Sequence, residues 1–343
     1  MKKLRVAFGD RSYDIIIEKG SRSKLAEIFG IEKRRAFIVT DSGVPSEYAM
    51  DVANGFDQAE IYTVPMGEVS KSLDVFGKIS ARMLEIGITR SDVCIAVGGG
   101  VVGDLCGFVA ASYMRGIDFY NMPTTLLSMV DSSIGGKTAI NHAGVKNIIG
   151  AFYQPKGVLI DCETLSSLPK KHMAGGMAEA IKMAMTSDKD LFGIFENFNK
   201  DDIDIETVIL RSLMIKKRVV EEDEREGGLR KILNFGHTYG HAVEAASEMS
   251  ILCHGECVAI GMMAVCDGDV RERLAAVLKK FDLPTSYFGD QKDALLLIST
   301  DKKRHGSYID AILVSEIGNC EIKKMSLDEF SELVKKNTGG KIR

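Results

Sequence analysis

Short apolar runs alternate with amphipathic stretches through the first half of the chain. Residues 4–8 and 13–17 alternate polar with apolar side chains on either side of a turn, which is the pattern of a β-hairpin. The pattern then predicts strands at 35–41, 60–64, 92–100, 119–123 and 157–162, with helices at 71–87 and 103–114 between them. Strands that alternate with helices pair in parallel and carry the helices on their faces, so residues 1–160 are predicted to form an α/β domain.

The pattern changes after Pro169, where runs of β-branched residues become rare. Helical periodicity predicts helices at 173–186, 205–222, 238–249 and 254–281. Residues 161–343 are therefore predicted to form an all-α domain. A chain of 343 residues exceeds the usual size of one hydrophobic core. Ligands often bind where two domains meet, so both are expected to contribute to one cleft.

The composition is that of an ordinary globular protein, with 45% hydrophobic residues, 27% charged residues and a net charge of −4. This balance gives no indication of nucleic acid binding. No uninterrupted run of about 18 apolar residues predicts a membrane span, and the start of the chain lacks the continuous apolar core of a signal peptide. The seven cysteines are scattered and form no C-x-x-C pair, which favours structural thiols and a cytoplasmic location.

A glycine-rich segment, VGGGVVGD (97–104), follows an apolar run and precedes a helical pattern. It satisfies G-x-G-x-x-G, and in a strand–loop–helix unit such glycines let backbone N–H groups face a pyrophosphate. The acidic residue usually found about 20 positions later is missing. We therefore predict a phosphate-binding loop in a non-standard nucleotide-binding domain. The alternative is that the glycines only permit a tight turn and close packing of the helix on the strand.

The segment DSSIGGKT (131–138) is similar to a P-loop, but that motif requires glycine where Asp131 stands. This excludes a nucleotide triphosphatase of the P-loop kind. Lys137, Lys146 and Asn147 lie in the same polar stretch, which is interrupted by glycines. Their side chains either bind a ligand or belong to a solvated loop.

His237 and His241 are two of only six histidines, and their spacing of four places both imidazoles on one face of a helix. The zinc motif H-E-x-x-H would require glutamate where Thr238 stands. Whether both histidines are metal ligands therefore stays open at this point. His254 is a further candidate in the helical half, because a catalytic zinc site takes three His, Glu or Asp ligands.

Glu179 is an acid within an otherwise small and apolar helical pattern. An unpaired carboxylate is costly in such surroundings, which makes Glu179 a candidate metal ligand. Lys182 lies three residues later on the same helical face. The alternative is that the two form only an ion pair.

Five blocks of the sequence resemble the 3-dehydroquinate synthase family in their order and spacing, over roughly residues 35–320. They are GGGVVGDLCGFVAASYMRG (98–116), MPTTLLSMVDSSIGGKTAINHAGVKNIIGAFYQP (122–155), GGMAEAIKMAM (175–185), DEREGGLRKILNFGHTYGHAVE (223–244) and HGECVAIGM (254–262). The resemblance implies a Rossmann-like NAD-binding domain followed by an all-α domain, and a homodimer. It also implies an enzyme of the shikimate pathway.

The implied reaction converts 3-deoxy-D-arabino-heptulosonate 7-phosphate into 3-dehydroquinate and phosphate. Its steps are transient oxidation by NAD, β-elimination of phosphate, reduction by the same cofactor and intramolecular aldol closure. NAD is not consumed. A divalent cation acts as a Lewis acid on the hydroxyl that is oxidised.

The resemblance assigns roles to individual residues. One divalent metal, Zn²⁺ or Co²⁺, is expected on Glu179, His237 and His254. The substrate carboxylate is expected at Lys216, Arg230 and Asn234. The phosphate is expected at Lys137, Asn147, His241 and either Lys302 or Lys303, with Arg115 supplied by a second subunit. The ring hydroxyls are expected at Asp131 and Lys182.

The resemblance likewise implies a set of NAD-binding positions. They are Asp41, Glu68, Lys71, Gly99, Gly100, Val101, Val102, Gly103, Asp104, Thr124, Thr125, Lys137, Lys146, Thr164, Leu165, Ser166 and Ser167. Asp41 ends a predicted strand, where an acid can accept a hydrogen bond from a ribose hydroxyl, so the acid precedes the glycine loop. Met66 and Val69 depart from the family's usual DGE-type loop, and HAGVKN (142–147) departs from its commoner HPLGKN. The first segment still contains Glu68 and Lys71, and the second still contains Lys146 and Asn147.

Three alternatives compete with this interpretation. Sister cyclases such as 2-deoxy-scyllo-inosose or 2-epi-5-epi-valiolone synthase share the metal residues, but Arg230 and His241 favour the dehydroquinate enzyme. Iron-dependent alcohol or glycerol dehydrogenases share the two-domain plan and lack the blocks around 131–138 and 228–241. A non-catalytic NAD-binding sensor would have little reason to keep the metal residues and both groups of cations.

Overall fold

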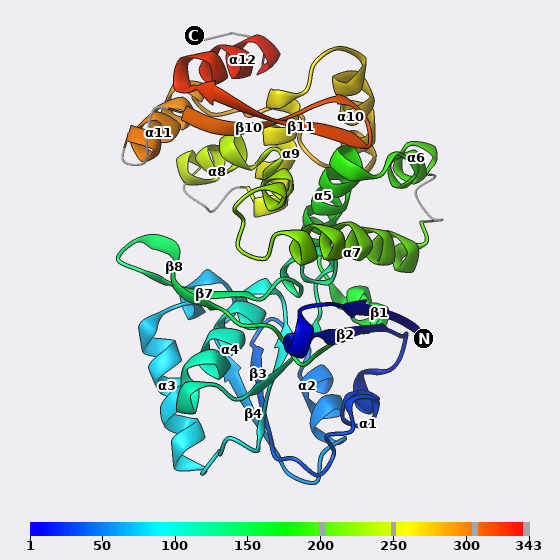
Figure 1. Cartoon of the computed structure of the whole chain (residues 1–343), viewed down its shortest axis with the longest axis vertical. Coiled ribbons are helices and arrows are strands. Elements are labelled where there is room, and N and C mark those ends of the chain that lie inside the picture. Colours follow the sequence, from blue (N-terminus) through cyan, green and yellow to red (C-terminus); the bar gives the residue numbers. More distant parts are fainter. Residues whose placement is uncertain (199–202, 248–251, 304–307, 339–343) are drawn as a thin grey trace. The chain divides into compact units, whose positions relative to one another are not determined.

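The structure is a computed structural model that describes residues 1–198, 203–247, 252–303 and 308–338, with the backbone alone at 299–303. The chain forms two compact units, Met1–Leu168 and Pro169–Arg343 (Figure 1). The sequence pattern placed this division between residues 160 and 161. Each unit is described by itself below.

The first unit is built on a seven-stranded sheet with the order β1-β2-β9-β6-β5-β3-β4. Its strands are β1 (Lys2–Val6), β2 (Tyr13–Ile17), β3 (Ala36–Asp41), β4 (Ala59–Val64), β5 (Val93–Gly98), β6 (Asp118–Pro123) and β9 (Gly157–Ile160). Strands β1 and β2 pair antiparallel, and every other pair in the sheet is parallel. The predicted hairpin and parallel α/β sheet are confirmed.

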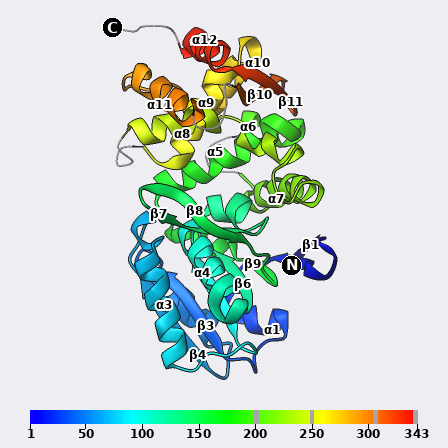
Figure 2. The same cartoon turned by 60° about the vertical axis from the view of Figure 1, so that its left-hand side comes forward.

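Helices cover both faces of this sheet (Figure 2). They are α1 (Leu25–Phe29), α2 (Ser46–Ala53), α3 (Leu73–Glu85) and α4 (Gly100–Ser112). Strand β3 sends Ile38 into a core with α1 and α2, whereas its neighbours Phe37 and Val39 enter a second core with α3 and α4. This alternation explains why β3 and β5 read as continuous apolar runs, since both faces of each strand are buried.

The strand order reverses between β3 and β5, because β4 lies on one side of β3 and the later strands lie beyond β5. In sheets of this kind ligands bind outside the carboxyl ends of the strands at such a reversal. Asp41 ends β3, and the glycine loop follows β5. The topology therefore brings the acid and the glycine loop to the same edge of the sheet.

A separate hairpin, β7 (Lys137–His142) and β8 (Val145–Phe152), forms where the sequence suggested a polar stretch interrupted by glycines. Its turn uses Ala143 and Gly144 at φ of 51° and 78°. Much of β8 is exposed, so its residues lack the apolar run that marks a buried strand.

The second unit is mainly helical, but it is not the all-α domain that the sequence pattern predicted, because it also contains a β-hairpin. Its helices are α5 (Lys170–Ser187), α6 (Lys189–Asn197), α7 (Ile205–Glu222), α8 (His237–Ala246), α9 (His254–Val265), α10 (Gly268–Lys280), α11 (Gln291–Lys303) and α12 (Leu327–Thr338). Helix α5 is buried from Gly175 to Thr186, so residues on all its sides face protein. No helix in the described parts of the chain is long and apolar enough to cross a membrane.

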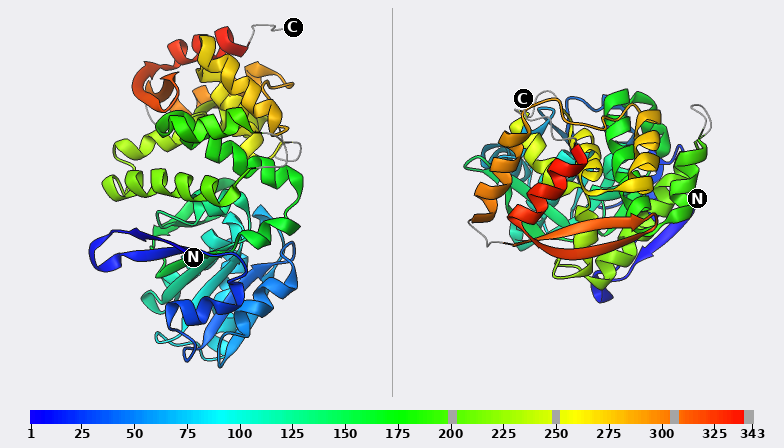
Figure 3. Two further views of the ribbon diagram at one scale, coloured as in Figure 1. Left: turned by 90° about the vertical axis from the view of Figure 1, so that its right-hand side faces the viewer. Right: turned by 90° about the horizontal axis from the view of Figure 1, so that it is seen from above.

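Two features of this unit differ from the sequence pattern. An antiparallel hairpin, β10 (Tyr308–Glu316) and β11 (Asn319–Ser326), was not predicted; it packs against α9 and α12 (Figure 3). The predicted helix at 254–281 is two helices, α9 and α10. The chain is extended at Cys266, which pairs with Val314 of β10, and Asp267 then caps α10 by accepting from Gly268 N.

Candidate functional site

Helix α5 carries the two buried charges of the second unit that the sequence singled out. Glu179 and Lys182 are each 1% exposed, and Lys182 Nζ lies 2.5 Å from Glu179 Oε2. Burial alone would raise the pKa of Glu179, but the Lys182 ammonium and two nearby histidines hold it well below its usual value. The ion pair considered for these residues is thus present, and the carboxylate is ionised.

Helices α8 and α9 approach each other closely because glycines line their contact. A Cβ on Gly240 would lie 2.8 Å from the Cys257 carbonyl oxygen, and one on Gly261 would lie 1.8 Å from the Gly236 carbonyl oxygen. His237 and His254 are the first residues of these two helices. Their rings are 5.4 Å apart between centroids as a result.

The second oxygen of Glu179 faces both imidazoles. Among the described residues Glu179 Oε1 has no hydrogen-bond partner, and it lies 3.7 Å from His237 Nε2 and 3.5 Å from His254 Nε2. Ligand atoms bound to one tetrahedral Zn²⁺ lie roughly 3.3–3.6 Å apart. Two imidazoles and one carboxylate with these spacings fit a catalytic zinc or cobalt site.

His241 lies one helical turn beyond His237. Its ring centroid is 5.1 Å from that of His237 and 5.7 Å from that of His254. One nitrogen from each of the three imidazoles lies within 4.8 Å of the others. The structure therefore brings together two overlapping sets of ligands, which share His237 and His254 and differ in whether Glu179 or His241 is the third.

The two shared histidines have different electrostatic surroundings. Burial and the Lys182 ammonium lower the pKa of His237 to about 3, so its imidazole is neutral. Burial would lower the pKa of His254 as well, but the Glu179 and Glu244 carboxylates outweigh it and raise that pKa to about 9. A metal ion would have to displace this proton from His254.

The remaining ring nitrogens also have partners, and the sequence pattern identified neither of them. His254 Nδ1 lies 3.0 Å from Glu244 Oε2, and His237 Nδ1 lies 3.2 Å from the Phe235 carbonyl oxygen. Both Nε2 atoms are thereby left facing Glu179. Glu244 is seven residues after His237 on the same helix, and that spacing of two turns was the one signal in the sequence.

Two of the predicted substrate cations are buried in the second unit. Lys216 of α7 is 6% exposed and Arg230 is 2% exposed. Asp223 accepts hydrogen bonds from the backbone N–H groups of Gly227, Gly228 and Arg230 and so shapes the loop that leads to Arg230. Asn234, also predicted, donates from Nδ2 to Glu226 at 2.6 Å. Glu226 had not been predicted.

In the first unit, helix α4 begins at Gly100, within the glycine-rich segment 97–104. A Cβ on Gly98 would lie 2.6 Å from the Val102 side chain, and one on Gly99 would lie 3.0 Å from that of Thr125. Close packing therefore requires Gly98 and restricts Gly99. The same arrangement places Thr124 and Thr125 against the N-terminal turn of α4, where backbone N–H groups favour an anion.

A polar network joins several of the residues that the family resemblance assigned to NAD or substrate. Lys71 is 4% exposed, and its Nζ lies 2.6 Å from Asp104 Oδ2 and also bonds Asn147 Oδ1. Asn141 was not predicted; it donates to Glu68 Oε1 at 2.9 Å and accepts from Asn147 N at 2.8 Å. Asn147 has a φ of 54°, and this second bond helps to hold that unusual backbone.

The other predicted positions of the first unit are spread over several elements. Asp41 is 9% exposed and accepts from Gly43 N at 2.8 Å. Lys137 and Lys146 are exposed on the β7–β8 hairpin, and Asp131 lies in the helical turn before it. Thr164, Leu165, Ser166 and Ser167 form a 3₁₀ helix after β9, and Arg115 lies exposed in a turn. Lys302 and Lys303 have side chains outside the described residues.

Comparison with known proteins agrees with the sequence blocks. Family models match two parts of the chain, as 3-dehydroquinate synthase N-terminal over residues 61–175 and 3-dehydroquinate synthase C-terminal over residues 176–304. The chain belongs to the 3-dehydroquinate synthase family. The family resemblance proposed from the sequence is thus confirmed.

Two relatives named 3-dehydroquinate synthase illustrate how far this similarity extends. The protein from Streptococcus mutans serotype c is 40% identical over 97% of this chain and 100% of its own length. The protein from Lactococcus lactis subsp. cremoris is 39% identical over the same shares. The similarity therefore extends over nearly the whole of this chain and the full length of both relatives.

Solved structures with the same fold include sister cyclases. A 2-deoxy-scyllo-inosose synthase complexed with carbaglucose-6-phosphate, NAD⁺ and Co²⁺ matches with a TM-score of 0.84 at 24% identity, over 98% of this chain and 100% of that one. A 2-epi-5-epi-valiolone synthase from Streptomyces hygroscopicus with NAD⁺ and Zn²⁺ bound gives 0.85 at 25%, over 96% and 98%. A glycerol dehydrogenase from Schizosaccharomyces pombe gives 0.65 at 16%, over 94% and 88%. The predicted Rossmann-like plus helical fold is confirmed.

Proposed function

We propose that the chain catalyses the reaction of its family, the conversion of 3-deoxy-D-arabino-heptulosonate 7-phosphate into 3-dehydroquinate and phosphate. The observation that carries the chemistry is the ionised, buried Glu179, whose Oε1 faces the Nε2 atoms of His237 and His254. These three side chains would hold one zinc or cobalt ion, which supplies Lewis acidity at the substrate hydroxyl. NAD⁺, when bound, accepts a hydride and returns it.

The nucleotide is assigned to the carboxyl edge of the sheet in the first unit. Asp41 would accept a hydrogen bond from a ribose hydroxyl at the end of β3. The first turn of α4, from Gly100 to Asp104, would face the pyrophosphate with its backbone N–H groups. Lys71 forms an ion pair with Asp104 and so offsets the negative charge of that carboxylate at this edge. The other positions that the family resemblance assigned to NAD are also proposed to contact the cofactor.

The substrate is assigned to several cations, of which Lys182, Lys216 and Arg230 are buried and therefore little screened by solvent. Arg230 can bind the substrate carboxylate with two parallel hydrogen bonds, and Lys216 adds a second charge. Lys182 Nζ, held by Glu179, would donate to a ring hydroxyl next to the metal. Lys137, Asn147 and His241 are proposed for the phosphate, and Asp131 for the ring hydroxyls. These groups fix the orientation of the substrate, which converts binding energy into rate.

The decisive experiment measures inorganic phosphate released from the heptulosonate phosphate by the purified protein. We expect release that requires NAD⁺, is abolished by a metal chelator and returns on addition of Zn²⁺ or Co²⁺. The matched control replaces the substrate with glucose 6-phosphate or sedoheptulose 7-phosphate. Turnover of either control in place of the heptulosonate phosphate would reassign the chain to a sister cyclase, since those enzymes share its fold.

We further propose that the protein is a cytoplasmic homodimer. None of its seven cysteines forms a disulfide, and Cys94 and Cys106 remain thiols although their sulfur atoms are 3.4 Å apart. Reduced cysteines agree with a reducing compartment. The dimer is proposed because Arg115, exposed in a turn, is assigned to the substrate of a second subunit.

A further inference from the structure

We propose that Glu244 is a positioning residue that orients His254 for metal binding and strengthens it as a ligand. The inference rests on the metal site of the proposed function. It concerns a carboxylate that belongs to neither of the two possible sets of metal ligands, and it follows from what Glu244 contacts.

Glu244 is directed at His254 by the close packing of two helices. It lies on α8 two turns after His237, so both side chains extend from the face that packs on α9. Its carboxylate is 15% exposed, and Oε2 lies 3.0 Å from His254 Nδ1. The opposite ring nitrogen, Nε2, lies 3.5 Å from Glu179 Oε1. The imidazole of His254 is thus held between two carboxylates.

This arrangement selects one form of the imidazole. Both carboxylates only accept hydrogen bonds, but Glu244 Oε2 lies at hydrogen-bond distance from Nδ1, 3.0 Å, whereas Glu179 Oε1 lies 3.5 Å from Nε2 and makes no hydrogen bond. The proton of a neutral His254 therefore resides on Nδ1, facing Glu244. The lone pair of Nε2 is then directed at Glu179 Oε1 and His237, where the metal would bind. A carboxylate on the far nitrogen also increases the basicity of a ligating imidazole.

His237 provides an internal comparison. Its Nδ1 faces the Phe235 carbonyl oxygen at 3.2 Å, which orients the ring but brings no negative charge. The two imidazoles therefore differ, because only His254 has a carboxylate on the nitrogen that faces away from the metal. Removing Glu244 should weaken the binding of the metal by His254 and leave its binding by His237 unchanged.

A purely structural role for Glu244 would be to anchor the start of α9, but that end already has its own support. Cys253 N donates to Glu256 Oε2 at 2.7 Å, and Glu256 also lies 3.4 Å from Lys171 Nζ. The first turn of α9 is thus capped by a residue of its own helix. Glu244 accepts a hydrogen bond from the ring of His254, which is the part of that residue that would contact a metal.

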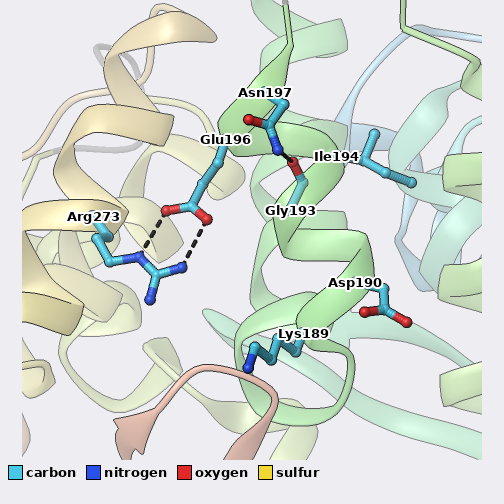
Figure 4. Close-up of a pocket in the computed structure, with 7 residues that line it drawn as sticks. All are labelled: Lys189, Asp190, Gly193, Ile194, Glu196, Asn197 and Arg273. Carbon is cyan, nitrogen blue, oxygen red and sulfur yellow. Dashed lines mark hydrogen bonds and ion pairs between the residues drawn. The ribbon is translucent and has the colours of Figure 1, made fainter.

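The test compares the full-length variants Glu244→Ala and Glu244→Gln with the wild type. The control is Glu196→Gln, which removes a carboxylate from the same unit; Glu196 forms a two-point ion pair with Arg273 at 2.7 Å (Figure 4). The dissociation constant for Co²⁺ or Zn²⁺ is measured by competition with a chelator. We expect Glu244→Ala to weaken binding by about 10- to 100-fold. Glu244→Gln still accepts from Nδ1–H but lacks the charge, so we expect a loss of about 3- to 10-fold.

Two further measurements separate positioning from folding. Thermal unfolding of the metal-free proteins identifies any variant that fails to fold, and in that case Glu244→Gln alone decides. Nitrogen-15 spectra of the imidazoles should show His254 protonated on Nδ1 when neutral in the wild type and a mixture of tautomers in Glu244→Ala. Wild-type metal affinity in a folded Glu244→Ala or Glu244→Gln protein overturns the proposal, as does the same loss in the control.

The outcome is distinguishable from failure of the proposed function. A wild-type protein that binds one metal ion but releases no phosphate from the heptulosonate phosphate would refute that function, and the ranking of metal affinities would still decide the role of Glu244. A wild-type protein that binds no divalent metal would refute both.

Discussion

At the scale of single residues, the surroundings of each histidine in the cluster indicate which role it has. His237 and His241 are one turn apart and belong to the same sequence motif. His237 is 12% exposed at its side chain and faces the Glu179 carboxylate, whereas His241 lies on the exposed side of α8. Spacing alone presents them as an equal pair, and burial makes them different. We therefore expect His237 to bind the metal and His241 to contact the substrate.

Replacing each histidine by alanine tests this division. His237→Ala should lose the metal on dialysis, because only His254 and Glu179 of the proposed ligands remain. His241→Ala should keep one metal ion per chain while phosphate release falls by roughly 100-fold, the size of effect expected of a single positioned donor. Metal analysis of the dialysed proteins checks both. A metal-free His241→Ala protein would show that His241 is itself needed to bind the metal and would refute this division of roles.

At the residue scale, the sequence predicted which individual side chains matter better than it predicted which residues those side chains contact. Glu179 and Lys182 were recognisable because charges in an apolar helix must be compensated. Asn141 and Glu244 were not, because their importance comes from contacts with Asn147 and His254, which only the folded chain brings near. A side chain that acts through another residue leaves no pattern of its own.

At the scale of elements, helices α8 and α9 form the structural basis of the proposed metal site. Each presents a histidine at its first position, and glycines at the contact let the two backbones touch. The sequence predicted these helices from their periodicity. It did not predict the break after α9, since Cys266 is extended through its pairing with β10, which is distant in sequence. The β10–β11 hairpin was missed because much of β11 is exposed and lacks an apolar run.

Gly261→Ala tests the contact between α8 and α9. The new Cβ would lie 1.8 Å from the Gly236 carbonyl oxygen, so the helices must separate. We expect a cost of about 3 kcal/mol in unfolding free energy, together with weaker metal binding. Gly193→Ala in α6 is the matched control, because no heavy atom lies within 4 Å of its Cβ and alanine there should stabilise by about 0.5–1 kcal/mol. Urea unfolding and metal titration measure both. Equal effects of the two substitutions would contradict the argument.

The ion pair at the start of α6 predicts a pH dependence of stability. Asp188 accepts from Leu191 N at 3.0 Å and from Arg211 at 2.9 and 2.6 Å. Burial would raise the pKa of Asp188, but these hydrogen bonds lower it. The stabilisation is therefore complete above the unfolded pKa of about 3.9 and is lost as the pH falls through the lower folded pKa.

Asp188→Ala should accordingly destabilise the protein by about 2 kcal/mol near pH 7. The difference from the wild type should shrink as the pH falls from about 4, where Asp188 of the unfolded chain begins to take up a proton, through the lower pKa of the folded protein. Urea unfolding followed across this range measures it. Asp188→Asn, which retains a capping oxygen without the charge, should fall between the two, and a gap that stays constant down to the lowest pH would contradict the ionic argument.

At the scale of the whole molecule, the family assignment and the fold followed from the order of five sequence blocks, and the topology explains why those blocks matter. The reversal of strand order between β3 and β5 brings Asp41 and the glycine loop to one edge, although some 60 residues separate them in sequence. This is why the acid absent after the glycine loop was found before it. The assembly cannot be inferred in this way, because a second subunit leaves no trace in the strand order.

Arg115 makes the proposed dimer testable. Met114 and Arg115 both adopt positive φ, 51° and 66°, in the turn that ends α4. Such backbone is costly for residues other than glycine, and here it places an exposed guanidinium at the surface. If this group serves the active site of the other subunit, Arg115→Ala should be inactive on its own while it retains metal and NAD⁺.

Mixed dimers then provide the decisive result. Arg115→Ala and Lys182→Ala are each expected to be inactive alone. In a dimer of one chain of each, the Arg115→Ala chain keeps its own Lys182 and receives Arg115 from its partner, so one of the two active sites is complete. Random exchange of subunits at equal amounts makes half of the dimers mixed, and about a quarter of wild-type phosphate release should return. If mixing restores nothing although subunit exchange is verified by differently tagged chains, Arg115 acts within its own chain or not at all.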